Sequence, residues 1–235
     1  MAKNFGKVFT SGLGTAEPYA YLVKPDYGNE AKGFGNPRGV YKLSLTLPTA
    51  SPRCQAMINE IVATHEEAYA EALADHEANP PAVARGKKPL VPYEGDLPFF
   101  DNGDGTTTFK FSSYASYTDK KTKESKPLVL LLVDSQGKRL TEAPAFVGGG
   151  SKLKVKYKIM PYKWNPTVGA SVKLQLESVM IVELVAGNQS DGGWGDDDRE
   201  EGGYTSGPQS EGGWSGRDAE GGNDAEDDDS EDGDF

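Results

Sequence analysis

Hydrophobic and polar residues alternate along several stretches of the first 186 residues, and this alternation predicts β-strands. Period-two patterning places one face of a strand in the core and the other in water. The alternating apolar positions are Tyr41, Leu43, Leu45 and Leu47, then Phe109 and Phe111, then Leu153, Val155, Tyr157 and Ile159, and finally Val172, Leu174 and Leu176 at the start of a long strand toward Val185.

Two further stretches depart from simple alternation. Residues 128–133 are continuously aliphatic and precede the turn sequence Asp-Ser-Gln-Gly, which predicts a buried strand that enters a turn. Tyr114 has the opposite parity to Phe109 and Phe111, and we interpret this change as a bulge or a strand break.

Helical spacing appears once, and it predicts an amphipathic helix over about residues 51–78. Ser51 is a favourable N-cap, and Pro52 occupies the first helical position. The helix should end before Asn79, because two prolines follow it. The apolar residues that share one side of this helix are Cys54, Met57, Ile58, Ile61, Val62, Ala68, Tyr69, Ala72 and Leu73.

About five strands and one inserted helix within 186 residues predict a mainly β domain. The first choice is an oligonucleotide/oligosaccharide-binding (OB) fold, a five-stranded Greek-key barrel, and a β-sandwich is the alternative. Residues 187–235 contain 13 Gly and hardly any aliphatic side chains. Burial there cannot offset the roughly 1–2 kcal/mol per residue that fixing the backbone costs, so we expect a disordered tail after a domain of residues 1–186.

Charge divides the chain at the same place. Residues 187–235 hold 17 Asp+Glu and two basic residues, a net charge of −15, whereas residues 1–186 hold 23 Lys+Arg and 19 Asp+Glu, a net charge of +4. This division suggests a body that meets a polyanion and a tail that imitates the polyanion or recruits basic partners. The tail ends on Phe235 after Asp232 and Asp234. That ending suits an anchor for a partner's pocket, with a solubilising appendage as the alternative.

A row of lysines is the first candidate for binding a polyanion. Lys152, Lys154, Lys156 and Lys158 share one face of a predicted strand. Their spacing of about 6.6–6.8 Å is close to the phosphate repeat of an extended nucleic-acid strand. The alternative is a solvated face on an edge strand, where lysines deter aggregation.

Aromatic residues follow the lysine row directly. Tyr162, Lys163 and Trp164 lie between two prolines on a predicted loop, and exposed rings of this kind stack on bases at roughly 1–3 kcal/mol per base. The alternative is that Trp164 plugs one end of the barrel.

Two glycine-containing basic segments are weaker candidates. One is the loop with Arg85 and Lys87, and the other is the run of residues 33–39 that holds Arg38, in which glycines would let a ligand approach the backbone. Each is equally well explained as an ordinary surface loop.

Several other classes of protein find no support. Cys54 is the single cysteine, so an internal disulfide is excluded, which fits a reducing cytoplasm. The longest aliphatic run has six residues, against the roughly 20 of a membrane span. His65 and His76 would lie about 16 Å apart along a helix, too far to share a metal ion. Residues 101–105 resemble a calcium loop without its ligand spacing, so we expect a glycine-rich turn, and we expect no enzyme, cofactor or metal site.

Nine segments together resemble the single-stranded-DNA-binding protein of T-seven-type (autographivirus) lytic bacteriophages. They are GTAEPYAY, KPDYGNE, GFGNPRGVYK, HEEAYA, ANPPAVARGKKPL, PFFDNGDGTTTFKF, GGGSKLKVKY, PYKWN and VGASVKLQLESVM, and they extend from about residue 9 to residue 184. The resemblance implies an OB-fold, a homodimer, and a role in DNA replication, recombination and repair in the cytoplasm of the infected bacterium. It also implies that the protein coats single strands, promotes annealing, and contacts the phage DNA polymerase and primase-helicase through its acidic tail.

The same resemblance implies which residues contact DNA. Its DNA-contacting positions match Arg38, Arg85, Lys110, Tyr162 and Trp164, and its final aromatic matches Phe235. Ser112 stands where the family pattern has a second basic residue after Lys110. The N-terminus is about three residues longer, so either Lys3 or Lys7 supplies the N-terminal contact.

These observations lead to one preferred hypothesis and two alternatives. The preferred one is a non-enzymatic, sequence-tolerant binder of single-stranded DNA, whose cations neutralise phosphates and whose rings stack on bases. The acidic tail would occupy the same groove until DNA displaces it. The alternatives are a single-stranded-RNA regulator on the same barrel and an acidic-tailed chaperone or interaction protein.

Overall fold

The computed structural model describes residues 6–81 and 90–185, which belong to the first of two units, Met1–Gln189 and Ser190–Phe235. One α-helix, α1 (Pro52–Ala78), and one 3-10 turn, η1 (Glu30–Lys32), accompany the strands of this part. The strands are β1 (Phe9–Thr10), β2 (Gly14–Ala16), β3 (Tyr21–Asn29), β4 (Phe34–Pro48), β5 (Phe99–Asp101), β6 (Thr106–Tyr114), β7 (Ser116–Thr118), β8 (Ser125–Pro127), β9 (Leu131–Val133), β10 (Lys152–Asn165) and β11 (Gly169–Glu183).

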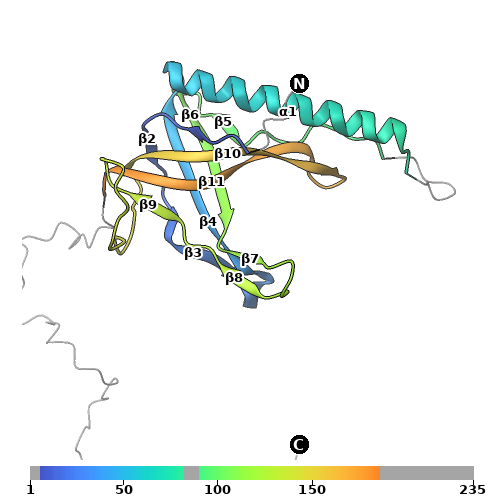
Figure 1. The fold of residues 1–235 in the computed structure, drawn as a ribbon. Helices are drawn as coiled ribbons and strands as arrows, with labels where there is room; N and C mark the ends of the chain where they lie inside the picture. Colours follow the sequence, from blue (N-terminus) through green and yellow to red (C-terminus); the bar gives the residue numbers. More distant parts are fainter. Residues whose placement is uncertain (1–5, 82–89, 186–235) are drawn as a thin grey trace, which may run out of the picture. The chain divides into compact units, whose positions relative to one another are not determined.

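Five strands pair in a closed ring, in the order β2, β4, β6, β11 and β10, with β10 returning to β2 (Figure 1). The pairing of β6 with β11 is parallel, and the other four pairings are antiparallel. This closed ring is the small barrel of an OB-fold. The mainly β fold with one inserted helix is therefore confirmed, and the sandwich alternative is wrong.

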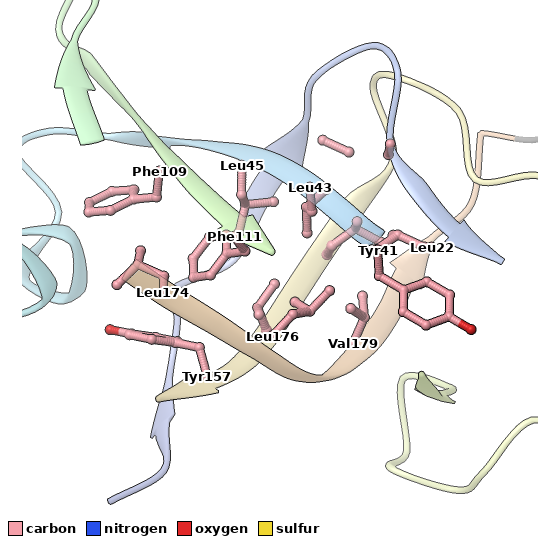
Figure 2. Packing of buried hydrophobic residues seen from close by; sticks show 14 of the residues in the cluster. Leu22, Tyr41, Leu43, Leu45, Phe109, Phe111, Tyr157, Leu174, Leu176 and Val179 are labelled. Carbon is pink, nitrogen blue, oxygen red and sulfur yellow. The ribbon is translucent and has the colours of Figure 1, made fainter. Parts of the chain in front are cut away.

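The side chains buried in the barrel core are those at the alternating apolar positions of the sequence. All the alternating apolar residues of β4, β6, β10 and β11 are buried. Figure 2 shows several of them, among them Leu43, Phe111 and Leu174, packing toward one another between the strands. The Phe111 and Tyr157 rings meet edge to face, with 5.2 Å between their centroids. Edge-to-face contacts of this kind add to the burial energy of the rings.

Helix α1 begins and ends as predicted. The Ser51 hydroxyl accepts a hydrogen bond from the Cys54 backbone N–H, Pro52 occupies the first turn, and the helix ends at Ala78. Cys54, Met57, Ile61 and His65 are its buried residues. No later position of the predicted apolar face is buried, because the second half of the helix runs past the barrel (Figure 1).

Residues 128–133 do not form the buried strand that their composition predicts. Strand β9 covers only Leu131–Val133 and pairs with β11, and Val133 also forms an isolated antiparallel bridge with Arg139. Leu130 and Leu132 face the core, while Val129 is 79% exposed. Because successive side chains of a strand point to opposite faces, only alternate residues of this segment reach the core.

Of the bulge or break predicted at Tyr114, the bulge is wrong, whereas a break does follow, since β6 ends at Tyr114 and β7 begins at Ser116. The register between β4 and β6 runs without interruption from Thr106 to Tyr114. Tyr114 instead points outward, on the same face of β6 as Lys110 and Ser112, and it is 42% exposed. The change of parity marks an aromatic residue on the solvent side of a regular strand.

None of the helices in the described ranges is long and apolar enough to span a membrane.

Cys54 provides a test of the helix placement. Its side chain is fully buried, and burial raises the pKa of the thiol. Both effects slow modification, so the native thiol should react with a disulfide reagent at pH 8 about a thousandfold or more slowly than the thiol in denaturant. Absorbance of the released thiolate measures both rates, and similar rates would contradict the packing of α1 on the barrel.

Candidate nucleic-acid interface

Four strands of the ring share an outward face, and their registers place polar side chains side by side across it. Lys42 of β4 lies opposite Ser112 of β6, Ser112 is in register with Gln175 of β11, and Gln175 lies opposite Lys158 of β10. Neighbouring strands are about 4.8 Å apart. The barrel therefore carries a band of polar and basic groups around this face, and we name the outward face of β4, β6, β11 and β10 the polar face.

Lys110 lies on the polar face, two residues before Ser112 in β6. Its side chain is exposed, and its Nζ lies 5.1 Å from the centroid of the Phe100 ring. Ser112 lacks the positive charge that the family pattern has at this position, and Lys42 on the adjacent strand lies directly across from it. Lys42 donates a hydrogen bond to Asp26, and this bond lowers the pKa of the Asp26 carboxyl. Asp26 therefore offsets the charge that Lys42 brings to the neighbourhood of position 112.

Arg38 lies within β4 and not in a surface loop, so the loop interpretation of residues 33–39 is wrong. The pairing of β3 with β4 extends through Gly35 and Phe34, which leaves only η1 and Gly33 as the turn. Arg38 Cζ lies 3.7 Å from the centroid of the Tyr114 ring, and one guanidinium nitrogen donates a 3.0 Å hydrogen bond to the Ser116 carbonyl. These two contacts fix the orientation of the guanidinium.

A groove of about 440 Å³ opens beside Arg38, where β6 ends. Lys173 Nζ lies 5.5 Å from the Tyr114 centroid, on the opposite side of β6 from the strand that carries Arg38. Lys158 also lines the groove and pairs with Glu177 at 3.1 Å. We name this hollow the Tyr114 groove.

The lysine row of β10 is not uniform. Lys154 and Lys156 are exposed, and neither has an ion pair within the described residues. Lys152 donates to the Thr15 hydroxyl at 2.7 Å, and Lys158 is the partner of Glu177. Two of the four charges are therefore engaged within the protein.

Tyr162 and Trp164 lie in the last part of β10 and not in a loop. This part of β10 pairs only with β11, so Pro161 can occupy it without leaving a ladder position unfilled. Both rings are half-buried and line a second hollow of about 480 Å³ between β10 and the second half of α1. We name it the Trp164 hollow.

Trp164 does not plug the barrel. It is absent from the buried core cluster, and its ring meets the edge of His76 of α1 at a centroid distance of 6.4 Å. Its indole nitrogen is buried and has no hydrogen-bond partner among the described groups. An unpaired donor beside a hollow is an uncommon arrangement, because buried polar groups are normally satisfied.

Among the remaining predicted contacts, the structure describes the side chain of Lys7 alone. Lys7 lies beside β1, with its Nζ 4.6 Å from the Phe9 ring centroid. The structure includes the backbone of Lys163 in β10 but does not describe its side chain. Six predicted positions lie outside the described residues, and they are Lys3, Arg85, Lys87, Asp232, Asp234 and Phe235.

Sequence reasoning missed Tyr114, Lys173 and Lys42 as residues of the interface. A signal was available for Tyr114, since its outward parity puts an aromatic on the same face as Lys110. Lys173 alternates with Val172 and Leu174, and this also predicts an outward cation. What the sequence could not supply is the parallel pairing that brings β11 next to β6.

Neither a metal site nor a calcium loop is found within the described ranges. No three His, Cys, Asp or Glu side chains lie close enough there to hold a metal ion. Residues 101–105 form the turn from β5 to β6, as predicted, with Gly103 and Gly105 at positive φ. The Asp101 and Asp104 carboxylates accept backbone N–H bonds within this turn.

Comparison with known proteins gives consistent results. A family model described as "Single-stranded DNA-binding protein, Bacteriophage T7" matches residues 13–184. The single-stranded DNA-binding protein of Enterobacteria phage T3 is 70% identical over 201 residues, which are 85% of this chain and 86% of the relative. That of Escherichia phage T7 is 67% identical over 201 residues, 86% of each chain. The crystal structure of gp2.5, a single-stranded DNA-binding protein encoded by bacteriophage T7, is similar at a TM-score of 0.69 and 64% identity, covering 81% of this chain and 97% of that one.

Proposed function

The chain belongs to the T7-type family of bacteriophage single-stranded DNA-binding proteins, and we propose that its polar face and the Trp164 hollow bind the DNA strand without sequence preference. One observation carries this proposal. The polar face holds exposed cations, and two half-buried rings, Tyr162 and Trp164, lie at the end of β10, which is one of its strands. Cations that follow the backbone and rings that stack on bases are the two elements of sequence-tolerant binding.

The proposal assigns phosphate contacts to Arg38, Lys110 and Lys154, and stacking to Tyr162 and Trp164. Arg85, Lys87, Lys163 and the N-terminal contact from Lys3 or Lys7 complete it as predictions from the sequence. All these side chains offer charge or ring surface and none offers a nucleophile with a base, so the protein acts by binding and not by catalysis.

Salt dependence tests this function. If about 4 phosphates are neutralised, log K should fall against log salt with a slope near −2.8, or about fiftyfold between 50 and 200 mM salt. Fluorescence anisotropy of labelled oligo-dT with the full-length protein measures the slope. A slope near zero, or no binding at 50 mM salt, would refute the proposal.

Two alternatives give different results in related assays. An RNA regulator would prefer an RNA oligonucleotide over DNA of equal sequence in direct competition. An acidic-tailed chaperone, in which the barrel is only a scaffold, predicts that residues 1–186 alone have no affinity for oligonucleotides.

We further propose the roles that the T7-type resemblance implies, namely replication, recombination and repair of phage DNA in the infected bacterium, with annealing of complementary strands. Partner proteins, the phage DNA polymerase and primase-helicase, would bind the acidic tail through Asp232, Asp234 and Phe235. The tail's charge of −15 and its aromatic end support this assignment. We also expect a homodimer, and sedimentation equilibrium measures it.

A further inference from the structure

The ring of Tyr114 lies between cations from the two strands that flank β6. Arg38 of β4 stacks on it at 3.7 Å, and the ammonium of Lys173 of β11 lies 5.5 Å from the same centroid. An aromatic ring stabilises nearby cations through its quadrupole, so it can hold two like charges in one place. The result is a local concentration of positive charge on the polar face.

Neither cation has an ion-pair partner in the part of the chain that the structure describes. Within residues 6–81 and 90–185, the ion pairs join Lys42 to Asp26, Lys126 to Asp119 and Lys158 to Glu177, and none involves Arg38 or Lys173. Arg38 donates one N–H group to the Ser116 carbonyl, and its other N–H groups remain for a ligand. A planar guanidinium held in this way matches two oxygens of a phosphate.

One carboxylate lies in the same groove. Glu177 pairs with Lys158 through Oε2 at 3.1 Å, and its Oε1 accepts a 3.0 Å hydrogen bond from Gln175. Glu177 therefore cancels the charge of Lys158, and the surplus in the Tyr114 groove comes from Arg38 and Lys173.

Resting on the function proposed above, we infer that Arg38 and Lys173 form a subsite for a backbone phosphate of the bound strand, with Tyr114 as the positioning residue that orients the guanidinium. Lys110 lies four residues from Tyr114 on the same face of β6, about 13 Å away, which is close to two phosphate repeats of an extended strand. One strand can therefore contact Lys110 and continue into the Tyr114 groove.

Removal of Lys173 tests the subsite. In oligo-dT titrations with the full-length protein, Lys173→Ala should make the salt slope less negative by about 0.7, the value for one phosphate contact on a single strand. Lys138→Ala, which removes an exposed lysine from the turn after β9, is the matched control and should leave the slope unchanged. An unchanged slope in Lys173→Ala overturns the subsite, as does an equal change in both variants.

Four further variants separate a positioning role from a structural one. Tyr114→Phe should retain the wild-type slope, whereas Tyr114→Leu should match Arg38→Ala, because only an aromatic ring holds the guanidinium. Glu177→Gln should strengthen binding several-fold and steepen the slope, since it frees Lys158, and damage to the fold cannot produce such a gain. Weaker binding by Glu177→Gln, or an intact slope in Tyr114→Leu, contradicts the inference. If the wild-type protein itself fails to bind oligo-dT, the proposed function fails instead.

Discussion

Deletion of residues 187–235 is expected to tighten the binding of oligo-dT by several-fold or more at low salt. The deleted segment carries a net charge of −15, and the remaining chain carries +4. An anionic segment tethered to a cationic domain competes with any other polyanion, and its removal also leaves a domain that attracts the strand over a longer range. The deletion removes no residue of the buried core, because every member of that cluster lies between Phe9 and Ile181.

The measurement is a titration of both proteins at two salt concentrations. The difference in affinity between them should shrink as salt rises, because screening weakens the competition. The shortened protein should also fail to capture the polymerase and primase-helicase, and Phe235→Ala in the full chain should weaken that capture without changing DNA binding. Weaker DNA binding by the shortened protein would show that the tail does not compete.

Trp164→Ala is expected to reduce affinity by a factor that persists at high salt, whereas the loss from Lys110→Ala should fade. Stacking of a base on an indole contributes about 1–3 kcal/mol and does not depend on counterions. A phosphate contact releases a counterion, so its contribution falls as salt increases. At 50 mM salt the two losses should be of similar size, and at 300 mM that of Trp164→Ala should be the larger.

The control for Trp164 is Phe146→Ala, which removes a ring that is 46% exposed and lies outside both the Tyr114 groove and the Trp164 hollow. Thermal unfolding of each variant separates a loss of packing against α1 from a loss of stacking. Parallel losses for Trp164→Ala and Lys110→Ala at all salt concentrations would refute this division between stacking and charge.

The barrel core was predictable because its strands are long and regular. In β4 and β10 a period-two pattern continues over enough residues to fix which face is buried, and α1 carries both an N-cap and a terminating proline pair. The short strands β1, β2, β5, β7 and β8 were not predicted, because two or three residues carry no periodicity. Their positions depend on partners that are distant in the sequence.

The sequence named candidate site residues one by one, but it did not predict how they are arranged on the surface. Lys110 and Arg38 were named from the resemblance, but the contact of Arg38 with Tyr114 depends on the register between β4 and β6. Trp164 was expected on an open loop, yet it packs against His76, because α1 runs on past the barrel toward the end of the β10–β11 hairpin. Half of the lysine row is engaged with Thr15 and Glu177, a fact that alternation alone cannot reveal.

The ring is closed by residues from opposite ends of the domain, since Thr15 pairs with Lys152 and Ala16 with Leu45. Such a barrel has a high contact order, and folding that depends on distant pairings typically takes milliseconds to seconds. Closure must wait until β10 and β11 have left the ribosome, so the nascent chain exposes β2 and β6 with β4 as their one ring neighbour. The polar face, which we propose binds DNA, is consequently assembled only after synthesis of the domain is nearly complete.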